Sequence, residues 1–132
     1  MARTTLGKEL EVRTTNQKGQ LAKVTGPISE ARVNITGMAA IGQGSDAYFW
    51  FVTSDNTKAR EVLTKAGLKV EERDVCCVEL DDRPGTAFDA ANRLAGAGLN
   101  IDHWYFSSGV GSTSKVYFSC DNCQKATQVL GS

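Results

Sequence analysis

The chain has 132 residues, enough for one domain of ordinary size or for two very small ones. Fifteen basic and fifteen acidic residues give a net charge of zero, so we expect no nucleic-acid surface and no polybasic membrane patch. No apolar stretch approaches the ~20 residues of a membrane span, and the start lacks the apolar core of a signal peptide. These features predict a soluble, cytoplasmic protein.

The first half of the chain predicts the order strand, helix, strand, strand, helix, strand. Alternation of Leu10, Val12 and Thr14 with charged residues is typical of a strand. The predicted strands cover residues 9–15, 33–41, 47–53 and 68–73. The first helix carries Leu21, Val24, Ile28 and Ala31 at helical spacing, and Gly26-Pro27 predicts a kink or an early break in it. The second helix begins at Asp55 or Asn56 and ends at Gly67.

The second half repeats this order but stops early. A strand begins at about Val75, and the following helix, residues 86–97, places Phe88, Ala91, Leu94 and Ala95 on one face. Two further strands cover residues 101–107 and 115–120, and a short helix covers residues 122–130. Because the sequence given ends at Ser132, we expect the second copy to lack its last strand.

Three sequence matches support an internal repeat with an offset of 66 positions. Asn16-Gln17-Lys18-Gly19 matches Asp82-Arg83-Pro84-Gly85, Val33-Asn34-Ile35 matches Leu99-Asn100-Ile101, and Asp55-Asn56 matches Asp121-Asn122. Each copy is small for independent folding, so we expect the copies to associate. The repeat predicts two domains, residues 8–74 and 75–132.

A β-α-β-β-α-β unit that opens with Asp/Asn-x-x-Gly and carries Val/Leu-Asn-Ile at its second strand resembles the ACT domain. Asp82-Arg83-Pro84-Gly85 is close to the Asp-x-Pro-Gly signature of that family, whereas Asn16-Gln17-Lys18-Gly19 lacks the proline. The resemblance covers about residues 9–131. It implies an α+β, ferredoxin-like βαββαβ fold repeated twice, in a small regulatory protein that binds amino acids. It also implies ligands at an interface between modules, against the first loop and the start of the second strand.

A free amino acid needs N–H donors for its carboxylate and acceptors for its ammonium group. Helix N-termini offer free N–H groups, and glycine lets a ligand approach the backbone closely. The predicted donors are the backbones of Gly19, Gln20 and Leu21 in the first copy and of Gly85, Thr86 and Ala87 in the second.

Side chains beside these donors complete the predicted ligand sites. They are Asn16, Asn34 and the adjacent Ile35 in the first copy, and Asp82, Asn100 and Ile101 in the second. The alternative is purely structural. Asn or Asp before a helix is commonly a cap or turn residue, and Asn after a helix is commonly in the left-handed conformation.

The four cysteines suggest a different chemistry. Cys120 and Cys123 form a C-x-x-C at a helix start, a position that lowers a thiol pKa. The context does not resemble thioredoxin, and Cys76 and Cys77 point to opposite faces of a strand, which argues against a four-thiolate zinc site. We therefore predict no catalytic residues, no metal ligands and no cofactor.

The sequence favours a regulatory protein, not an enzyme, that binds an amino acid or related metabolite and acts through ligand-dependent assembly of its modules. We expect at least a homodimer, because residues 75–80 would leave a free sheet edge unless another segment covers it. An enzyme or regulator acting in trans is a further expected partner. The alternatives are a structural dimerisation module without ligand, and a thiol-redox or metal protein that uses Cys120 and Cys123.

Overall fold

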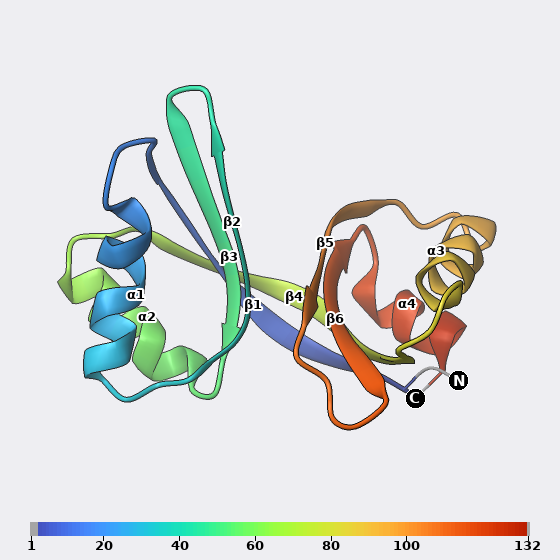
Figure 1. The fold of residues 1–132 in the computed structure, drawn as a ribbon. Coiled ribbons are helices and arrows are strands. Elements are labelled where there is room, and N and C mark those ends of the chain that lie inside the picture. The colour runs from blue at the N-terminus through green and yellow to red at the C-terminus, as the bar shows by residue number, and fades with distance from the viewer. Residues whose placement is uncertain (1–2, 132) are drawn as a thin grey trace. The chain divides into compact units, whose positions relative to one another are not determined.

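The computed structural model describes residues 3–131, which form two compact units built from corresponding elements (Figure 1). The first-copy unit comprises residues 8–73. The second-copy unit combines residues 74–131 with residues 3–7 of the N-terminal segment. Strands β1 (Arg3–Thr15) and β4 (Val70–Asp81) contribute residues to both units.

The first-copy unit is a four-stranded sheet with two helices on one face (Figure 1). Its elements after β1 are α1 (Gln20–Glu30), β2 (Ile35–Gln43), β3 (Asp46–Thr53), α2 (Asn56–Lys65) and the start of β4. The strand order is β2-β3-β1-β4, with antiparallel pairing of β3 to β1 and β2. Val24 and Ile28 of α1 pack with Leu63 of α2 on the sheet residues Val12 and Phe51, and all five are fully buried.

The second-copy unit has the same architecture. It contains the end of β4, α3 (Thr86–Gly96), β5 (Ile101–Ser107), β6 (Thr113–Cys120) and α4 (Cys123–Leu130). The strand order is β1-β4-β6-β5, again with antiparallel pairing of β6 to its two neighbours β4 and β5. Its core joins Val78, Leu94, Phe118 and Ala126. The tandem ferredoxin-like βαββαβ fold predicted from the sequence is thus confirmed.

The N-terminal segment occupies the sheet edge beside β4 in the second-copy unit. No strand follows α4 within residues 3–131, as predicted, but β1 begins at Arg3, six residues before the predicted strand. Its residues 3–7 lie beside β4 in the second-copy unit, where the Thr4 N–H donates to the Gly131 carbonyl at 3.0 Å. The predicted free edge at residues 75–80 is therefore covered, and it no longer argues for a homodimer.

The spacing of the repeat changes by one residue within the second copy. Helices α2 and α4 are capped by Asp55 and Asn122, whose side chains accept from the backbone N–H groups of Lys58 and Lys125. These caps lie 67 positions apart, whereas Gly19 and Gly85 lie 66 apart. The β5–β6 hairpin loop holds the extra residue, so the predicted match of Asp55-Asn56 with Asp121-Asn122 is wrong by one position.

Two predictions about the helices also need correction. Helix α1 continues through Pro27 to Glu30, so it does not break early. In α3 the buried positions are Ala90 and Leu94, whereas Phe88 is 69% exposed and does not lie on the core face. The spacing of Phe88 and Leu94 is six residues, which places the two on different sides of a helix.

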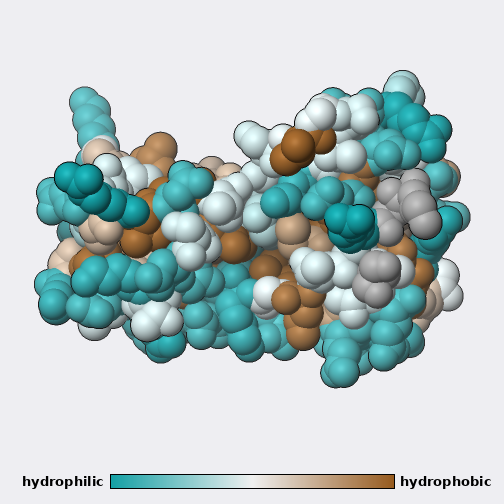
Figure 2. Space-filling view, turned by 90° about the horizontal axis from the view of Figure 1, so that it is seen from below, coloured by the Kyte–Doolittle hydropathy of each residue, from teal (hydrophilic) through white to brown (hydrophobic). Residues whose placement is uncertain are grey.

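The surface is mixed. On the face shown in Figure 2, hydrophobic side chains are interspersed among hydrophilic ones. The exposed large hydrophobic side chains of the described residues are Leu6, Leu21, Ile41, Phe88, Phe106 and Val110. Within residues 3–131, no helix is long and apolar enough to cross a membrane.

Candidate functional site

The first helix of each copy begins in the same unusual way. Gly19 precedes α1 with φ = 82° and Gly85 precedes α3 with φ = 93°, and neither helix has a side-chain cap. Both values lie in the left-handed region that glycine tolerates best. A β-carbon added at either glycine would meet no atom within 4 Å, so the space beside the backbone is open.

These two helix starts differ from the other two. Helices α2 and α4 are closed by their own Asp55 and Asn122 side chains, so one first-turn N–H of each is already used. Helices α1 and α3 keep their first-turn N–H groups available, because these groups have no acceptor one turn earlier. A helix N-terminus of this kind attracts an anion. The structure thus places Gly19, Gln20 and Leu21, and the equivalent residues 85–87, where N–H donors were predicted.

Gln20 adds a buried acceptor to the start of α1. Its Nε2 donates to Thr15 Oγ1 at 3.3 Å, while its Oε1 is buried and has no hydrogen-bond partner within residues 3–131. Thr86, at the matching position of the second copy, contacts the backbone of its own turn instead. Its hydroxyl lies 2.9 Å from the Asp81 carbonyl and 3.2 Å from the Arg83 carbonyl, both acceptors.

Asn16 and Asp82 connect the first loop of each copy to a hairpin. The Asn16 N–H donates to the Ser45 carbonyl at 2.9 Å and its Nδ2 to the Gly44 carbonyl at 3.1 Å. The Asp82 N–H donates to the Ser112 carbonyl at 2.8 Å, and its side chain is exposed. Asn16 therefore has a structural role as well as a predicted binding role.

Asn34 and Asn100 stand exposed at the start of β2 and β5. Their backbones are fixed: the Asn34 N–H donates to Ser54 Oγ at 3.0 Å, and the Asn100 N–H donates to Asp121 Oδ1 at 3.2 Å. The left-handed residues after the helices are Arg32 (φ = 58°) and Gly98 (φ = 79°) instead. The left-handed structural explanation for the two asparagines is therefore wrong.

A matching irregularity follows each asparagine. The strand pairing shifts register between Ile35 and Gly37 in β2, and between Ile101 and His103 in β5. Such bulges bend a strand and redirect nearby side chains, and they occur often beside functional sites. Their recurrence at one place in both copies was not visible in the amino-acid pattern.

Within one copy, the predicted donors and the predicted asparagine lie at opposite ends of a helix. Gly19 precedes α1 and Asn34 follows it, as Gly85 and Asn100 do for α3. Eleven residues at about 1.5 Å per residue separate the two ends by roughly 16 Å. The structure therefore does not bring the two groups together within one module.

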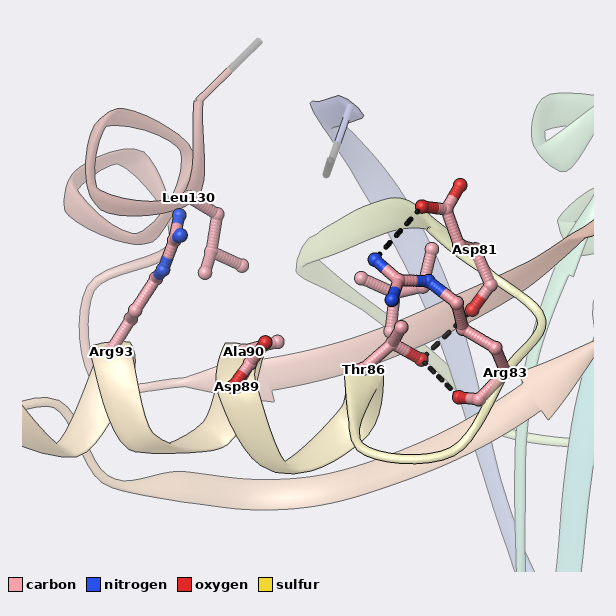
Figure 3. Close-up of a pocket in the computed structure, with 8 residues that line it drawn as sticks. Asp81, Arg83, Thr86, Asp89, Ala90, Arg93 and Leu130 are labelled. Atoms are coloured by element: carbon pink, nitrogen blue, oxygen red, sulfur yellow. Dashed lines mark hydrogen bonds and ion pairs between the residues drawn. The ribbon is translucent and has the colours of Figure 1, made fainter.

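A small cavity beside the first loop of the second copy is lined by charges of both signs. It measures about 60 Å³, and its charged residues are Asp81, Arg83, Asp89 and Arg93. Figure 3 shows the Arg83 guanidinium turned toward Asp81 and the Arg93 side chain extending toward Leu130. The Arg83 nitrogen lies 3.5 Å from the Asp81 carboxylate oxygen. Sequence reasoning missed Asp89 and Arg93, although their spacing of four residues places both on one side of α3.

Cys120, the first thiol of the C-x-x-C, is not activated. Burial raises the pKa of Cys120 to about 11, although a hydrogen bond from the backbone of Asn122 opposes this rise. Burial likewise raises the pKa of Cys76 far above its usual range. A thiol must ionise to act as a nucleophile, so this environment does not support the thiol-redox alternative.

Comparisons with known proteins identify the family of the chain. The family model of the ACT domain pair matches residues 5–131, so the chain belongs to the ACT domain family and carries a pair of these regulatory modules. No curated protein sequence matches the chain.

Solved structures share the fold at low sequence identity. Protein BT0572 from Bacteroides thetaiotaomicron has a TM-score of 0.87 at 21% identity, over 97% of this chain and 88% of that one. The regulatory subunit of aspartate kinase from Thermus thermophilus, in its ligand-free form, has a TM-score of 0.69 at 15% identity, over 96% and 93%. E. coli aspartokinase III in complex with lysine and aspartate has a TM-score of 0.56 at 15% identity, over 96% and 31%.

The left-handed glycine of α3 gives a stability test with an internal control. Gly85→Ala should lower the free energy of unfolding by about 1–2 kcal/mol, the usual cost of a β-carbon in this conformation. Gly96→Ala, within the same helix and also with open space around it, should raise it by about 0.5–1 kcal/mol. Urea unfolding followed by circular dichroism measures both. Equal effects of the two substitutions would contradict the backbone conformation assigned to Gly85.

Proposed function

We propose that this ACT domain pair binds a free amino acid or a related small metabolite, and that binding controls the association of modules from two chains. The observation that carries the proposal is the start of α1 and α3. In both copies a left-handed glycine, open space and an uncapped helix N-terminus coincide. This arrangement suits the carboxylate of a ligand.

The ammonium group of the ligand needs oxygen acceptors. Asn34 and Asn100 offer amide oxygens on exposed side chains whose backbones are held in place. The Oε1 of Gln20, which has no hydrogen-bond partner within residues 3–131, and the exposed carboxylate of Asp82 offer further acceptors beside the helix starts. Because the acceptors near the two helix starts differ, the two sites need not have equal affinity.

The separation of donors from asparagines supports a link between binding and assembly. An α-amino acid carries its two charged groups on neighbouring atoms, and the helix ends of one module are roughly 16 Å apart. One small ligand can therefore contact both kinds of group only when a second module supplies the other half, and in the proposed assembly that module belongs to a second chain. A ligand that needs two chains shifts the equilibrium toward their complex, since it has higher affinity for that state.

One structure that shares this fold motivates the choice of ligand class: E. coli aspartokinase III was solved in complex with lysine and aspartate. At 15% identity, the two proteins share the fold. We expect at least a homodimer. We also expect that an enzyme or regulator encoded by another chain responds to the ligand-bound state.

A thermal-shift screen against the twenty amino acids tests the proposal. One or a few of them should raise the unfolding temperature by several degrees, because a ligand at ~100 times its Kd stabilises by about 2.7 kcal/mol. Light scattering at micromolar protein should show the dimer fraction rising with that amino acid and staying constant with the others.

Absence of any shift across the screen would contradict amino-acid binding. A constant dimer in the same samples would then favour the ligand-free dimerisation module. A thermal shift without any change in the mass measured by light scattering would support amino-acid binding but contradict its link to assembly.

A further inference from the structure

Three of the four cysteines meet in the second-copy unit. Cys76 lies on β4, Cys120 ends β6 and Cys123 begins α4, and their sulfur atoms all lie within 4.8 Å of one another. Cys76 and Cys123 are buried, and Cys120 is half-buried. The Cys76 thiol donates to the Cys123 carbonyl at 3.3 Å. The cluster therefore ties together a strand, a strand end and a helix start.

The first copy shows that this corner of the fold does not need thiols. The corresponding residues are Leu10, Thr53 and Asn56, once the extra residue of the second hairpin is counted. Thr53 Oγ1 donates to Asn56 Oδ1 at 2.7 Å, and Asn56 Nδ2 donates to the Lys8 carbonyl at 3.0 Å. The polar pair thus joins the same elements by ordinary hydrogen bonds.

The second copy keeps the same connections with sulfur. Cys123 Sγ lies 3.9 Å from the Cys120 carbonyl and 3.7 Å from the carbonyl of Asp74, the counterpart of Lys8. Thiols are weak donors, so these contacts replace stronger hydrogen bonds. Three cysteines thus meet at one place where the first copy has none, and their weak hydrogen bonds do not match those of Thr53 and Asn56. This points to a role for the sulfur atoms themselves.

We propose that Cys76, Cys120 and Cys123 form a three-thiolate site for one soft metal ion of the class of zinc(II) and copper(I). Thiolate sulfur is the ligand these ions prefer, and soft ligands select them over magnesium or calcium. Zinc–sulfur bonds of about 2.3 Å in tetrahedral geometry put sulfur atoms roughly 3.8 Å apart, which is inside the 4.8 Å within which the three sulfur atoms lie. The half-buried Cys120 leaves a route for the ion and for an exogenous fourth ligand.

Proton release accompanies binding. Each of the three S–H groups loses its proton to solvent as its sulfur bonds the metal, so zinc(II) leaves one net negative charge and copper(I) leaves two. The smaller charge suits a partly buried site better, so zinc(II) is the expected ion. Because binding releases these protons, metal affinity increases with pH.

Cys77 provides a control within the same strand. It neighbours Cys76, but its side chain lies near Thr5, Lys115 and Tyr117 and contributes nothing to the cluster. This placement confirms that adjacent strand cysteines point apart. The objection to a metal site drawn from that fact applies only to Cys77.

Competition titration of the reduced 132-residue chain with a chromophoric zinc chelator tests the site. Wild type and Cys77→Ser should each bind one zinc(II) with equal affinity. Cys120→Thr introduces the residue that the first copy has at this position. It should weaken zinc binding on the order of a hundredfold, because one of the protein ligands and its part of the binding free energy are lost. The triple variant Cys76→Leu, Cys120→Thr, Cys123→Asn should not bind. A parallel titration with copper(I) identifies the preferred ion.

Circular dichroism checks that each variant is folded. If the triple variant does not fold, the comparison of Cys120→Thr with wild type is sufficient to test the site. Cobalt(II) offers a second readout, since sulfur-to-cobalt charge-transfer absorption appears only when thiolates coordinate the ion. Stoichiometric binding lost with Cys120→Thr but kept with Cys77→Ser supports the site. Failure of wild type to bind either ion, or equal binding by wild type and Cys120→Thr, would overturn it.

Discussion

Phe118→Ala is expected to lower the free energy of unfolding by about 3–5 kcal/mol, the usual cost of removing a buried aromatic ring. Phe118 is fully buried at the centre of the second-copy core and lies 5.5 Å from the Trp104 ring, measured between centroids. The loss is a large fraction of the ~5–15 kcal/mol that stabilises a typical small domain. Urea unfolding monitored by circular dichroism measures it.

Phe88→Ala is the matched control for this prediction. The same side chain is removed, but Phe88 is 69% exposed on α3, so the change should stay within about 0.5 kcal/mol. Similar losses for the two variants would mean that the buried face of α3 or the core of this unit is assigned incorrectly.

Removal of the exposed asparagine amides should weaken ligand binding without affecting the fold. Asn34→Ala and Asn100→Ala should each reduce affinity about ten- to hundredfold at the site they serve, because the ligand's ammonium group loses an acceptor worth about 1–3 kcal/mol. Both side chains are exposed, so stability should change by no more than about 0.5 kcal/mol. Calorimetric titration with the amino acid found in the screen measures the affinity.

Asn92→Ala is the control for these variants, because Asn92 is exposed on α3 away from the ends of the helix. It should leave affinity unchanged. A similar weakening by Asn92→Ala would show that the loss arises from a general effect on the protein and not from the site.

The repeat made most of the fold predictable. Turn residues before Gly19 and Gly85, and apolar spacing in each helix and strand, were enough to predict both βαββαβ units. The N-terminal part of β1 was not predictable, because residues 3–7 alternate weakly and their partner strand lies about seventy positions away. The extra residue in the β5–β6 loop was hidden because Asp-Asn occurs by coincidence at the unshifted offset.

The candidate sites were predictable only as separate parts. The sequence indicates which residues flank a helix. It does not indicate that Gln20 Oε1 is buried without a partner among the described residues, or that bulges follow Ile35 and Ile101. These features depend on tertiary packing. A zinc site of all four cysteines was rejected because Cys76 and Cys77 point apart, and a site of three was not considered. Strand pairing is what brings Cys76, 44 positions away in sequence, beside Cys120.

Calorimetry on the Asn34→Ala, Asn100→Ala double variant tests the central claim most directly. Wild type should bind the amino acid identified by the screen, and the double variant should bind it at least about tenfold more weakly while unfolding at the same urea concentration. Unchanged affinity in a folded double variant would place the ligand elsewhere and contradict an amino-acid site built from the helix starts and the two asparagines.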